Sequence, residues 1–159
     1  MKNIRIEIKW AIIFVVAQLL WMLLEKLVGL HSTHIDKHAI YTNFFGIIAI
    51  VIYVFALLDK RKNFYNGVMT YQQGFITGLI ITAIVTVLTP LVQYIISTVI
   101  TPEYFSNVIK YTVDSGAMNQ EAAEQFFNLQ SYMIQATIGA AIMGVITSAI
   151  VAIFTRKKA

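Results

Sequence analysis

The chain has 159 residues, of which 58% are hydrophobic and only 13% charged, and its mean hydropathy is +0.71. Soluble domains have about 25% charged residues, so a soluble fold of this size would leave too much apolar surface in water. The composition therefore predicts an integral membrane protein. The low glycine and proline content excludes collagen-like and disordered chains, and a sequence without cysteine excludes thiol catalysis, thiolate zinc sites and iron–sulfur clusters.

Four apolar segments are long enough to cross a bilayer as helices. They cover approximately residues 10–30, 34–58, 74–100 and 132–155. A helix needs about 20 apolar residues to cross a hydrocarbon core about 30 Å thick. None of the segments alternates in polarity as a membrane strand does. We therefore predict an all-α fold with four transmembrane helices in two hairpins, forming a single domain over residues 1–159.

The basic residues are concentrated on one side of these helices. Nine of the twelve precede the first segment, connect the second to the third, or follow the fourth: Lys2, Arg5, Lys9, Lys60, Arg61, Lys62, Arg156, Lys157 and Lys158. Lysine and arginine are retained in cytoplasmic loops, so we expect both termini in the cytoplasm. The net charge of +4 then reflects membrane topology, and no nucleic-acid partner is expected.

The segment between the third and fourth helices, about residues 102–131, is predicted to form an amphipathic helical hairpin on the outer side. Asp114-Ser115-Gly116 interrupts the helical pattern, and Asn119 is the expected N-cap of the second helix. The hairpin is too small to fold as an independent domain.

Small residues recur at every fourth position in the last two membrane segments. They are Gly74, Gly78, Thr82 and Thr86 in the third segment, and Ala136, Ala140, Gly144, Ser148 and Ala152 in the fourth. Such faces let two helix backbones approach closely. Two interpretations stay open: the faces meet inside the chain as an antiparallel pair, or one of them binds a second copy or another membrane protein.

Pro90 lies inside the third segment and predicts a kink there. We expect the hydroxyl of Thr86 or Thr89 to bond the carbonyl that the proline leaves free. The bend is either static or part of the wall of a solute path. Gln93 lies a turn further along, in the outer half of the same helix.

Gln18 and Glu25 lie seven residues apart and therefore share one face of the first helix. Gln18 is deep enough to bond to a neighbouring helix. Glu25 is next to Lys26, so we expect it to lie at the membrane interface beside water. A carboxylate buried in the membrane would instead indicate a functional site.

His31, His34 and His38 precede the second membrane segment with the spacing i, i+3, i+7. In one continuous helix the three imidazoles would share a face and could bind zinc or copper. If Thr33 caps the helix, however, His31 lies outside it and this geometry fails. With no firm fourth ligand we predict no metal-binding residue and expect solvated histidines, with a metal site or a pH-sensitive surface as alternatives.

Sequence motifs for enzymatic chemistry are absent: there is no glycine-rich phosphate loop, His-Glu-x-x-His or Gly-x-Ser-x-Gly. We therefore predict no enzyme, no catalytic residue and no cofactor. The small-residue faces favour an accessory or assembly subunit that acts through helix packing. The alternative is a small oligomeric transporter or channel that uses Pro90, Gln18 and Gln93, and a metal-dependent enzyme that uses the histidines is a more distant third.

Several segments together carry a family resemblance: residues 31–45, 59–67, 70–78, 101–105 and 156–158. In their order and spacing the chain resembles, over nearly its whole length, the bacterial membrane-protein family known as domain of unknown function 4199. The resemblance implies a four-helix protein of the bacterial inner membrane, with a longer loop before the last helix. It implies no activity, ligand or catalytic residue.

Overall fold

The computed structural model describes residues 4–157, and this part of the chain is helical and contains no strand. In chain order the elements are α1 (Arg5–Leu27), α2 (Ile35–Tyr41), the 3-10 turn η1 (Thr42–Phe44), α3 (Phe45–Asn63), α4 (Tyr71–Ile95), the π-helical turn η2 (Ile96–Ile100), α5 (Tyr104–Asp114), α6 (Gln120–Phe126) and α7 (Leu129–Thr155). The prediction of an all-α fold is confirmed.

Four helical segments are long and apolar enough to span a membrane, as the sequence predicts. They are Arg5–Leu27, Ile35–Asn63, Tyr71–Ile100 and Leu129–Thr155. Large apolar side chains on them are widely exposed, and both Val87 and Phe154 have 78% of their surface accessible. Water-soluble proteins rarely expose apolar surface on this scale, so the outer face of the bundle is compatible with lipid.

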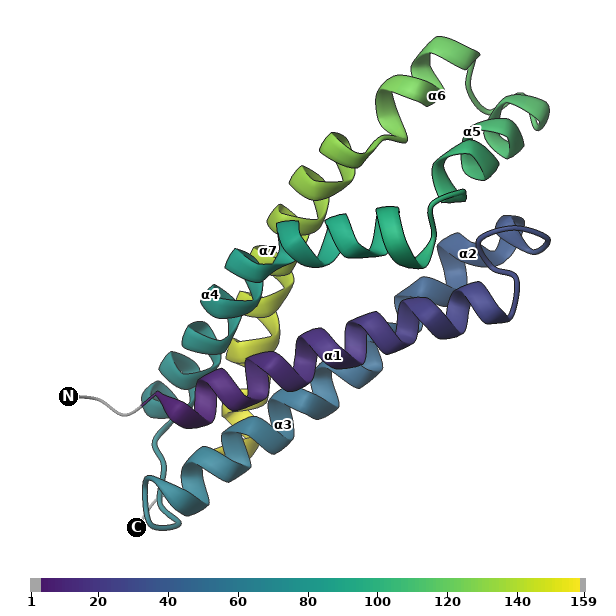
Figure 1. The fold of residues 1–159 in the computed structure, drawn as a ribbon. Helices are drawn as coiled ribbons and strands as arrows, with labels where there is room; N and C mark the ends of the chain where they lie inside the picture. The colour runs from purple at the N-terminus through teal and green to yellow at the C-terminus, as the bar shows by residue number, and fades with distance from the viewer. Residues whose placement is uncertain (1–3, 158–159) are drawn as a thin grey trace.

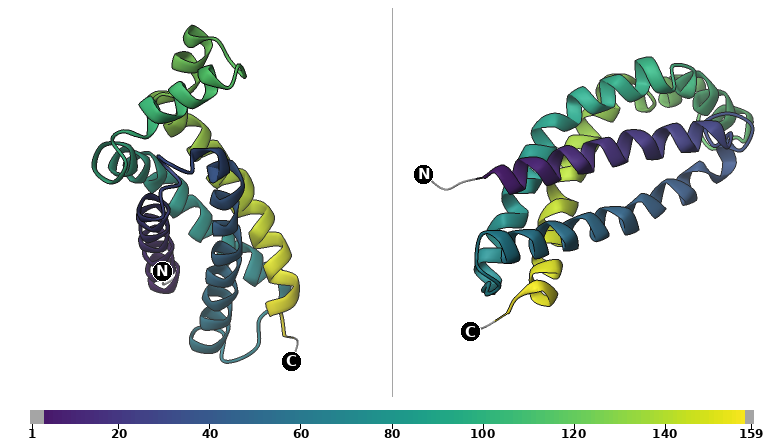
Figure 2. Two further views of the ribbon diagram at one scale, coloured as in Figure 1. Left: turned by 90° about the vertical axis from the view of Figure 1, so that its right-hand side faces the viewer. Right: turned by 60° about the horizontal axis from the view of Figure 1, so that its bottom comes forward.

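The helices form two antiparallel hairpins packed side by side (Figure 1). α1 packs against α3, α4 packs most extensively against α7, and α1 and α3 each contact the second hairpin as well. α1 begins and α7 ends at the same end of the bundle, which we call the terminus end (Figure 2). The opposite end carries α2, α5 and α6, and we call it the hairpin end.

The small-residue faces of α4 and α7 meet inside the chain. A Cβ added at Gly78 would lie 2.5 Å from Ser148 Oγ, and one added at Gly144 would lie 2.4 Å from Thr82 Cγ2. Ser148 and Thr82 also lie within hydrogen-bond distance of each other, at 3.3 Å. The interpretation as an internal antiparallel pair is therefore confirmed for these residues. Ala136, at the hairpin-end limit of the pattern, lines a cavity instead.

Charged residues tie α1 to α3 at the terminus end. Lys60 Nζ lies 2.9 Å from Glu7 Oε1, and both side chains are at most 3% exposed. Two residues further along α1, Lys9 pairs with Asp59, which also accepts a 2.7 Å hydrogen bond from Trp10 Nε1. α1 begins at Arg5, five residues before the predicted apolar segment that starts at residue 10. The helix can extend this far because Glu7 and Lys9 pair with Lys60 and Asp59.

α4 continues through Pro90 and bends away from α7 towards the hairpin end (Figure 1). The expected hydroxyl bond to the freed carbonyl of Thr86 is not formed. Thr89 Oγ1 donates to the carbonyl of Val85 at 2.8 Å, and Thr86 Oγ1 is buried without a partner in the described part of the chain. That expectation was wrong: a threonine hydroxyl in a helix can reach the carbonyl three or four residues before it, and Thr89 bonds the one four residues back rather than the freed carbonyl three residues back.

The predicted helical hairpin between the third and fourth long segments is present as α5 and α6. α5 ends at Asp114, and Gly116 has φ +73°, a left-handed conformation that suits glycine at a helix end. Asn119 caps α6, its side chain accepting a 2.8 Å hydrogen bond from the backbone N–H of Ala122. This hairpin covers the end of the bundle at which α4 and α7 have separated.

Candidate functional site

A cavity of about 870 Å³ lies at the hairpin end, between α1 and α2 on one side and α4, α5 and α7 on the other. Its polar lining residues include Gln18, Asp36, His38, Asn43, Gln93, Ser97, Thr101, Tyr104, Thr112, Tyr132 and Gln135. Towards the terminus end the helices close on a packed core that includes Tyr53, Leu57, Ile81 and Val151. The packed core therefore closes the cavity towards the terminus end.

Neutral hydrogen-bonding groups dominate the polar part of the cavity wall. Gln18 and Gln93, the two amides that the sequence singles out, both line it, and Gln93 Nε2 donates to Ser97 Oγ at 2.9 Å. Among the described lining residues, Asp36 is the one carboxylate, and it is exposed. Such a lining suits an uncharged polar ligand better than an ion.

Tyr104 connects the cavity to a second cluster of polar residues. Its ring is buried, and its hydroxyl lies 3.3 Å from His38 Nδ1 and 3.2 Å from the hydroxyl of Tyr132. Burial, reinforced by Tyr132, raises the pKa of the Tyr104 phenol above its ordinary value. The phenol therefore stays protonated at neutral pH and can both donate and accept hydrogen bonds.

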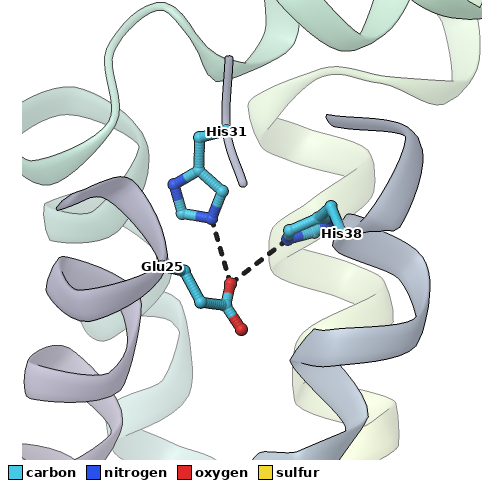
Figure 3. A group of neighbouring side chains, drawn as sticks. All are labelled: Glu25, His31 and His38. Carbon is cyan, nitrogen blue, oxygen red and sulfur yellow. Dashed lines mark hydrogen bonds and ion pairs between the residues drawn. The ribbon is translucent and has the colours of Figure 1, made fainter. Parts of the chain in front are cut away.

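The second cluster is centred on Glu25, in the last turn of α1 (Figure 3). Its Oε2 lies 3.0 Å from His31 Nε2 and 3.3 Å from His38 Nε2, so both imidazoles point to the same carboxylate oxygen. Trp21, one helical turn earlier, donates from its indole N–H to Oε1. We call Glu25, His31 and His38 the Glu25 cluster.

The turn after α1 brings these residues together. Gly29 has φ +79°, and its carbonyl accepts hydrogen bonds from the backbone N–H groups of Ser32 and His34. This tight turn folds His31 back over the end of α1. α2 then begins at Ile35 and places His38 next to His31, so that the two imidazole rings lie 5.0 Å apart and both reach the carboxylate (Figure 3).

Three expectations about this region were wrong. Glu25 is fully buried rather than beside water, and His31 is only 4% exposed rather than solvated. Thr33 does not cap α2, since His34 occupies the N-cap position without a side-chain cap bond. His34 itself is exposed, as expected of a solvated histidine, so the three histidines do not form one ligand set. Glu25, and not His34, is the third member of the group that contains His31 and His38. The turn after α1, rather than helical spacing, brings these three side chains together.

The sequence contains one signal for this cluster, which the spacing argument missed. A glutamate inside an apolar segment with Trp21 four residues before it can receive the indole hydrogen bond on one helix face. That both histidines reach the carboxylate follows only from the turn and from the packing of α5. Asn107 Nδ2 on α5 donates to the backbone carbonyl of His31 at 2.9 Å and holds the turn in place.

Comparison with known proteins gives a family but no activity. No curated protein and no solved structure matches the chain. The family described as "Protein of unknown function (DUF4199)" matches residues 9–157, nearly the whole length. This match agrees with the family resemblance seen in the order and spacing of the sequence segments. The chain belongs to this family of proteins of unknown function.

Proposed function

We propose that this chain is a multi-pass protein of the bacterial inner membrane that binds a small, uncharged polar solute in the hairpin-end cavity and acts as a small transporter. The observation that carries the proposal is the cavity of about 870 Å³ that reaches both Gln18 and Gln93. Ligand pockets in proteins measure about 300–1,000 Å³ and combine apolar walls with a few polar groups. A single chain supplies this volume, so the proposal does not need an oligomer.

The chemistry of the residues that line the cavity indicates the class of solute. Amides and hydroxyls can bond sugars, amides, alcohols or similar neutral groups, whereas an ion in the interior of the cavity would find no compensating charge apart from Asp36, which is exposed. Aromatic rings such as Tyr104, Tyr132 and Phe127 add apolar surface on which a planar or amphipathic solute can pack. We therefore propose an uncharged molecule with several hydrogen-bonding groups.

The direction of access follows from the charge distribution. Seven of the ten basic residues that the structure describes lie at the terminus end, near the start of α1, the end of α3 or the end of α7, which favours a cytoplasmic terminus end and an outward-facing cavity. The packed core and the Glu7–Lys60 ion pair then close the cytoplasmic side. Transport would require these contacts to open, and the bend of α4 near Pro90 provides a point of hinge motion.

The competing proposal is a non-enzymatic accessory subunit that binds a partner through its small-residue faces. The contacts of Gly78 and Gly144 within the α4–α7 pair use that surface internally, so it no longer supports a partner interface. Both proposals are non-enzymatic and need no cofactor. They differ in the mass of the intact complex after gentle purification, because a subunit would be recovered with a different protein.

Orientation is tested with single cysteines, since the sequence contains none. Ser106→Cys lies exposed on α5, and Lys62→Cys lies exposed at the end of α3. A membrane-impermeant maleimide added to spheroplasts should label Ser106→Cys and should label Lys62→Cys only after lysis. The reverse labelling would overturn the proposed orientation.

Solute access is tested with a matched pair on α7. Ala136→Cys faces the cavity, whereas Ala152→Cys lies in the fully buried core. Purified protein should react with the maleimide at Ala136→Cys and not at Ala152→Cys. A panel of neutral polar solutes should include one that slows the reaction at Ala136→Cys, raises the melting temperature, and is taken up by proteoliposomes.

The proposal fails if Ala136→Cys is as unreactive as Ala152→Cys, because the cavity would then be closed to water. It also fails if the panel gives no protection and the native complex contains a second protein. In that case the accessory-subunit proposal replaces it.

A further inference from the structure

We propose that the Glu25 cluster is a binding site for one divalent transition-metal ion of the zinc class. Each of Glu25, His31 and His38 offers one ligand atom, and these three atoms lie within 4.8 Å of one another. The proposal concerns a site different from the solute cavity, and it stands whether or not that cavity carries a solute.

The donor atoms have the chemistry that such an ion requires. Two imidazole nitrogens and one carboxylate oxygen form a common ligand set for zinc and for other first-row dications, whereas calcium and magnesium prefer oxygen ligands alone. Metal binding requires an ionised carboxylate and neutral imidazoles, and the bound cation would compensate the carboxylate charge in this buried site.

The distances fit the same ion. Zinc binds imidazole nitrogen at about 2.0–2.1 Å and carboxylate oxygen at about 2.0–2.2 Å, so two ligand atoms of a tetrahedral site lie about 3.3 Å apart. Glu25 Oε2 lies 3.0 Å from His31 Nε2 and 3.3 Å from His38 Nε2. The two imidazoles already converge on the same carboxylate oxygen (Figure 3). Only small side-chain shifts would open room for an ion between them.

Two imidazole nitrogens of the cluster are buried without a hydrogen-bond partner among the described residues. They are His31 Nδ1 and His38 Nε2, and the latter contacts the Glu25 oxygen without hydrogen-bond geometry. Buried polar atoms are nearly always bonded, since an unsatisfied one costs about 1–3 kcal/mol. A metal ion would give His38 Nε2 the partner that it lacks.

Neighbouring residues form hydrogen bonds that orient the three ligands, as residues around a metal site commonly do. Trp21 donates to the second carboxylate oxygen and orients Glu25. The Tyr104 hydroxyl, 3.3 Å from His38 Nδ1, can accept a hydrogen bond from the Nδ1–H of an imidazole that binds metal through Nε2. Asn107 anchors the backbone of His31.

Three protein ligands leave a coordination position for water. The cluster adjoins solvent-accessible spaces on several sides: His38 lines the 870 Å³ cavity, Glu25 lines a pocket of about 390 Å³, and His31 lines one of about 280 Å³. Because Glu25 is fully buried, entry of an ion and of a fourth ligand from these spaces requires movement of the side chains around it.

The test uses the full chain in detergent after treatment with a chelator. Titration with Co²⁺, followed by its visible d–d absorption, should show one equivalent bound with the intensity of a four- or five-coordinate site. Zn²⁺ should displace it stoichiometrically. Wild-type protein that binds no equivalent of either ion at micromolar concentration overturns the proposal, and this result does not depend on any variant.

The variants locate the ion. Glu25→Gln and His38→Gln should each weaken Zn²⁺ binding at least tenfold, with loss of the cobalt spectrum. His34→Ala is the matched control, because His34 is four residues from His38 but exposed and outside the cluster. His34→Ala should bind Zn²⁺ as wild type does.

If Glu25→Gln does not fold, His38→Gln, whose native side chain is partly exposed, carries the same test. Wild-type affinity in both folded variants, or an equal loss in His34→Ala, would show that the ion binds elsewhere. The Glu25 cluster would then be a buried ion-paired group without a metal.

Discussion

Gly144 on α7 lies so close to Thr82 on α4 that a Cβ added at Gly144 would sit 2.4 Å from Thr82 Cγ2 and 2.6 Å from Thr82 Oγ1. Gly78 makes the equivalent approach to Ser148 from the other helix. Close approach gains dispersion contacts that lipid cannot replace. The α4–α7 pair therefore depends on residues without bulk at these positions.

Gly144→Ala should destabilise the protein because the new methyl group overlaps Thr82. Overpacking of this kind costs about 1–3 kcal/mol. Gly139→Ala is the matched control on the same helix, since a Cβ there meets nothing within 4 Å. It should be neutral or slightly stabilising, because alanine favours a helix interior over glycine by up to about 1 kcal/mol.

Both glycine variants are compared with wild type by measuring the free energy of unfolding in mixed detergent micelles. Equal effects of the two substitutions would contradict the close contact between α4 and α7. A combined Gly144→Ala and Thr82→Ser variant, which removes the overlapping Cγ2, should recover part of the loss.

The Glu7–Lys60 ion pair should behave as a buried pair. Glu7→Gln leaves the Lys60 ammonium without its carboxylate in a site where the side chain is 3% exposed, and breaking such a pair costs about 3–5 kcal/mol. Adding Lys60→Met to Glu7→Gln should reduce the cost, since no buried charge then remains. The same unfolding measurement, arranged as a double-mutant cycle, gives the coupling energy.

Lys9→Ala serves as the control for this pair. The Lys9 side chain is 53% exposed and pairs with Asp59, and exposed ion pairs contribute about 0–1 kcal/mol. If Glu7→Gln costs no more than Lys9→Ala, the Glu7–Lys60 pair does not hold α1 to α3.

The buried phenol of Tyr104 should make the folded protein less stable at alkaline pH. Its pKa is raised in the folded protein by burial and by Tyr132, while in the unfolded chain a tyrosine has a pKa of about 10. Above that pH the unfolded chain releases a proton that the folded protein keeps, so the stabilisation is complete below about pH 10 and decreases as the pH rises further.

Tyr104→Phe removes this contribution, so its unfolding free energy should fall less steeply with pH than that of wild type. The difference in slope above pH 10 is up to about 1.4 kcal/mol per pH unit for one proton. Tyr111→Phe, at an exposed tyrosine of the same helix, should keep the wild-type slope. Identical slopes for Tyr104→Phe and wild type would contradict the burial of the Tyr104 phenol.

The four long apolar helices and the α5–α6 hairpin are predictable from the sequence because they depend on local properties. Hydropathy over about 20 residues predicts each long helix. Asp114-Ser115-Gly116 and Asn119 predict the break and the cap between α5 and α6, since a glycine at a helix end and an asparagine N-cap act within one turn. The four-residue repeat likewise predicts a face for close helix packing.

Tertiary structure decided the questions that depend on distant parts of the chain. The repeat at Gly78 and Gly144 is compatible with an internal pair or with a partner, and only the packing of α4 on α7 distinguishes them. The environment of Glu25 was predicted wrongly because its burial depends on the left-handed turn at Gly29 and on the position of α5. Charge and hydropathy describe single segments, whereas a buried cluster and a cavity form from several segments whose relative placement the local sequence does not encode.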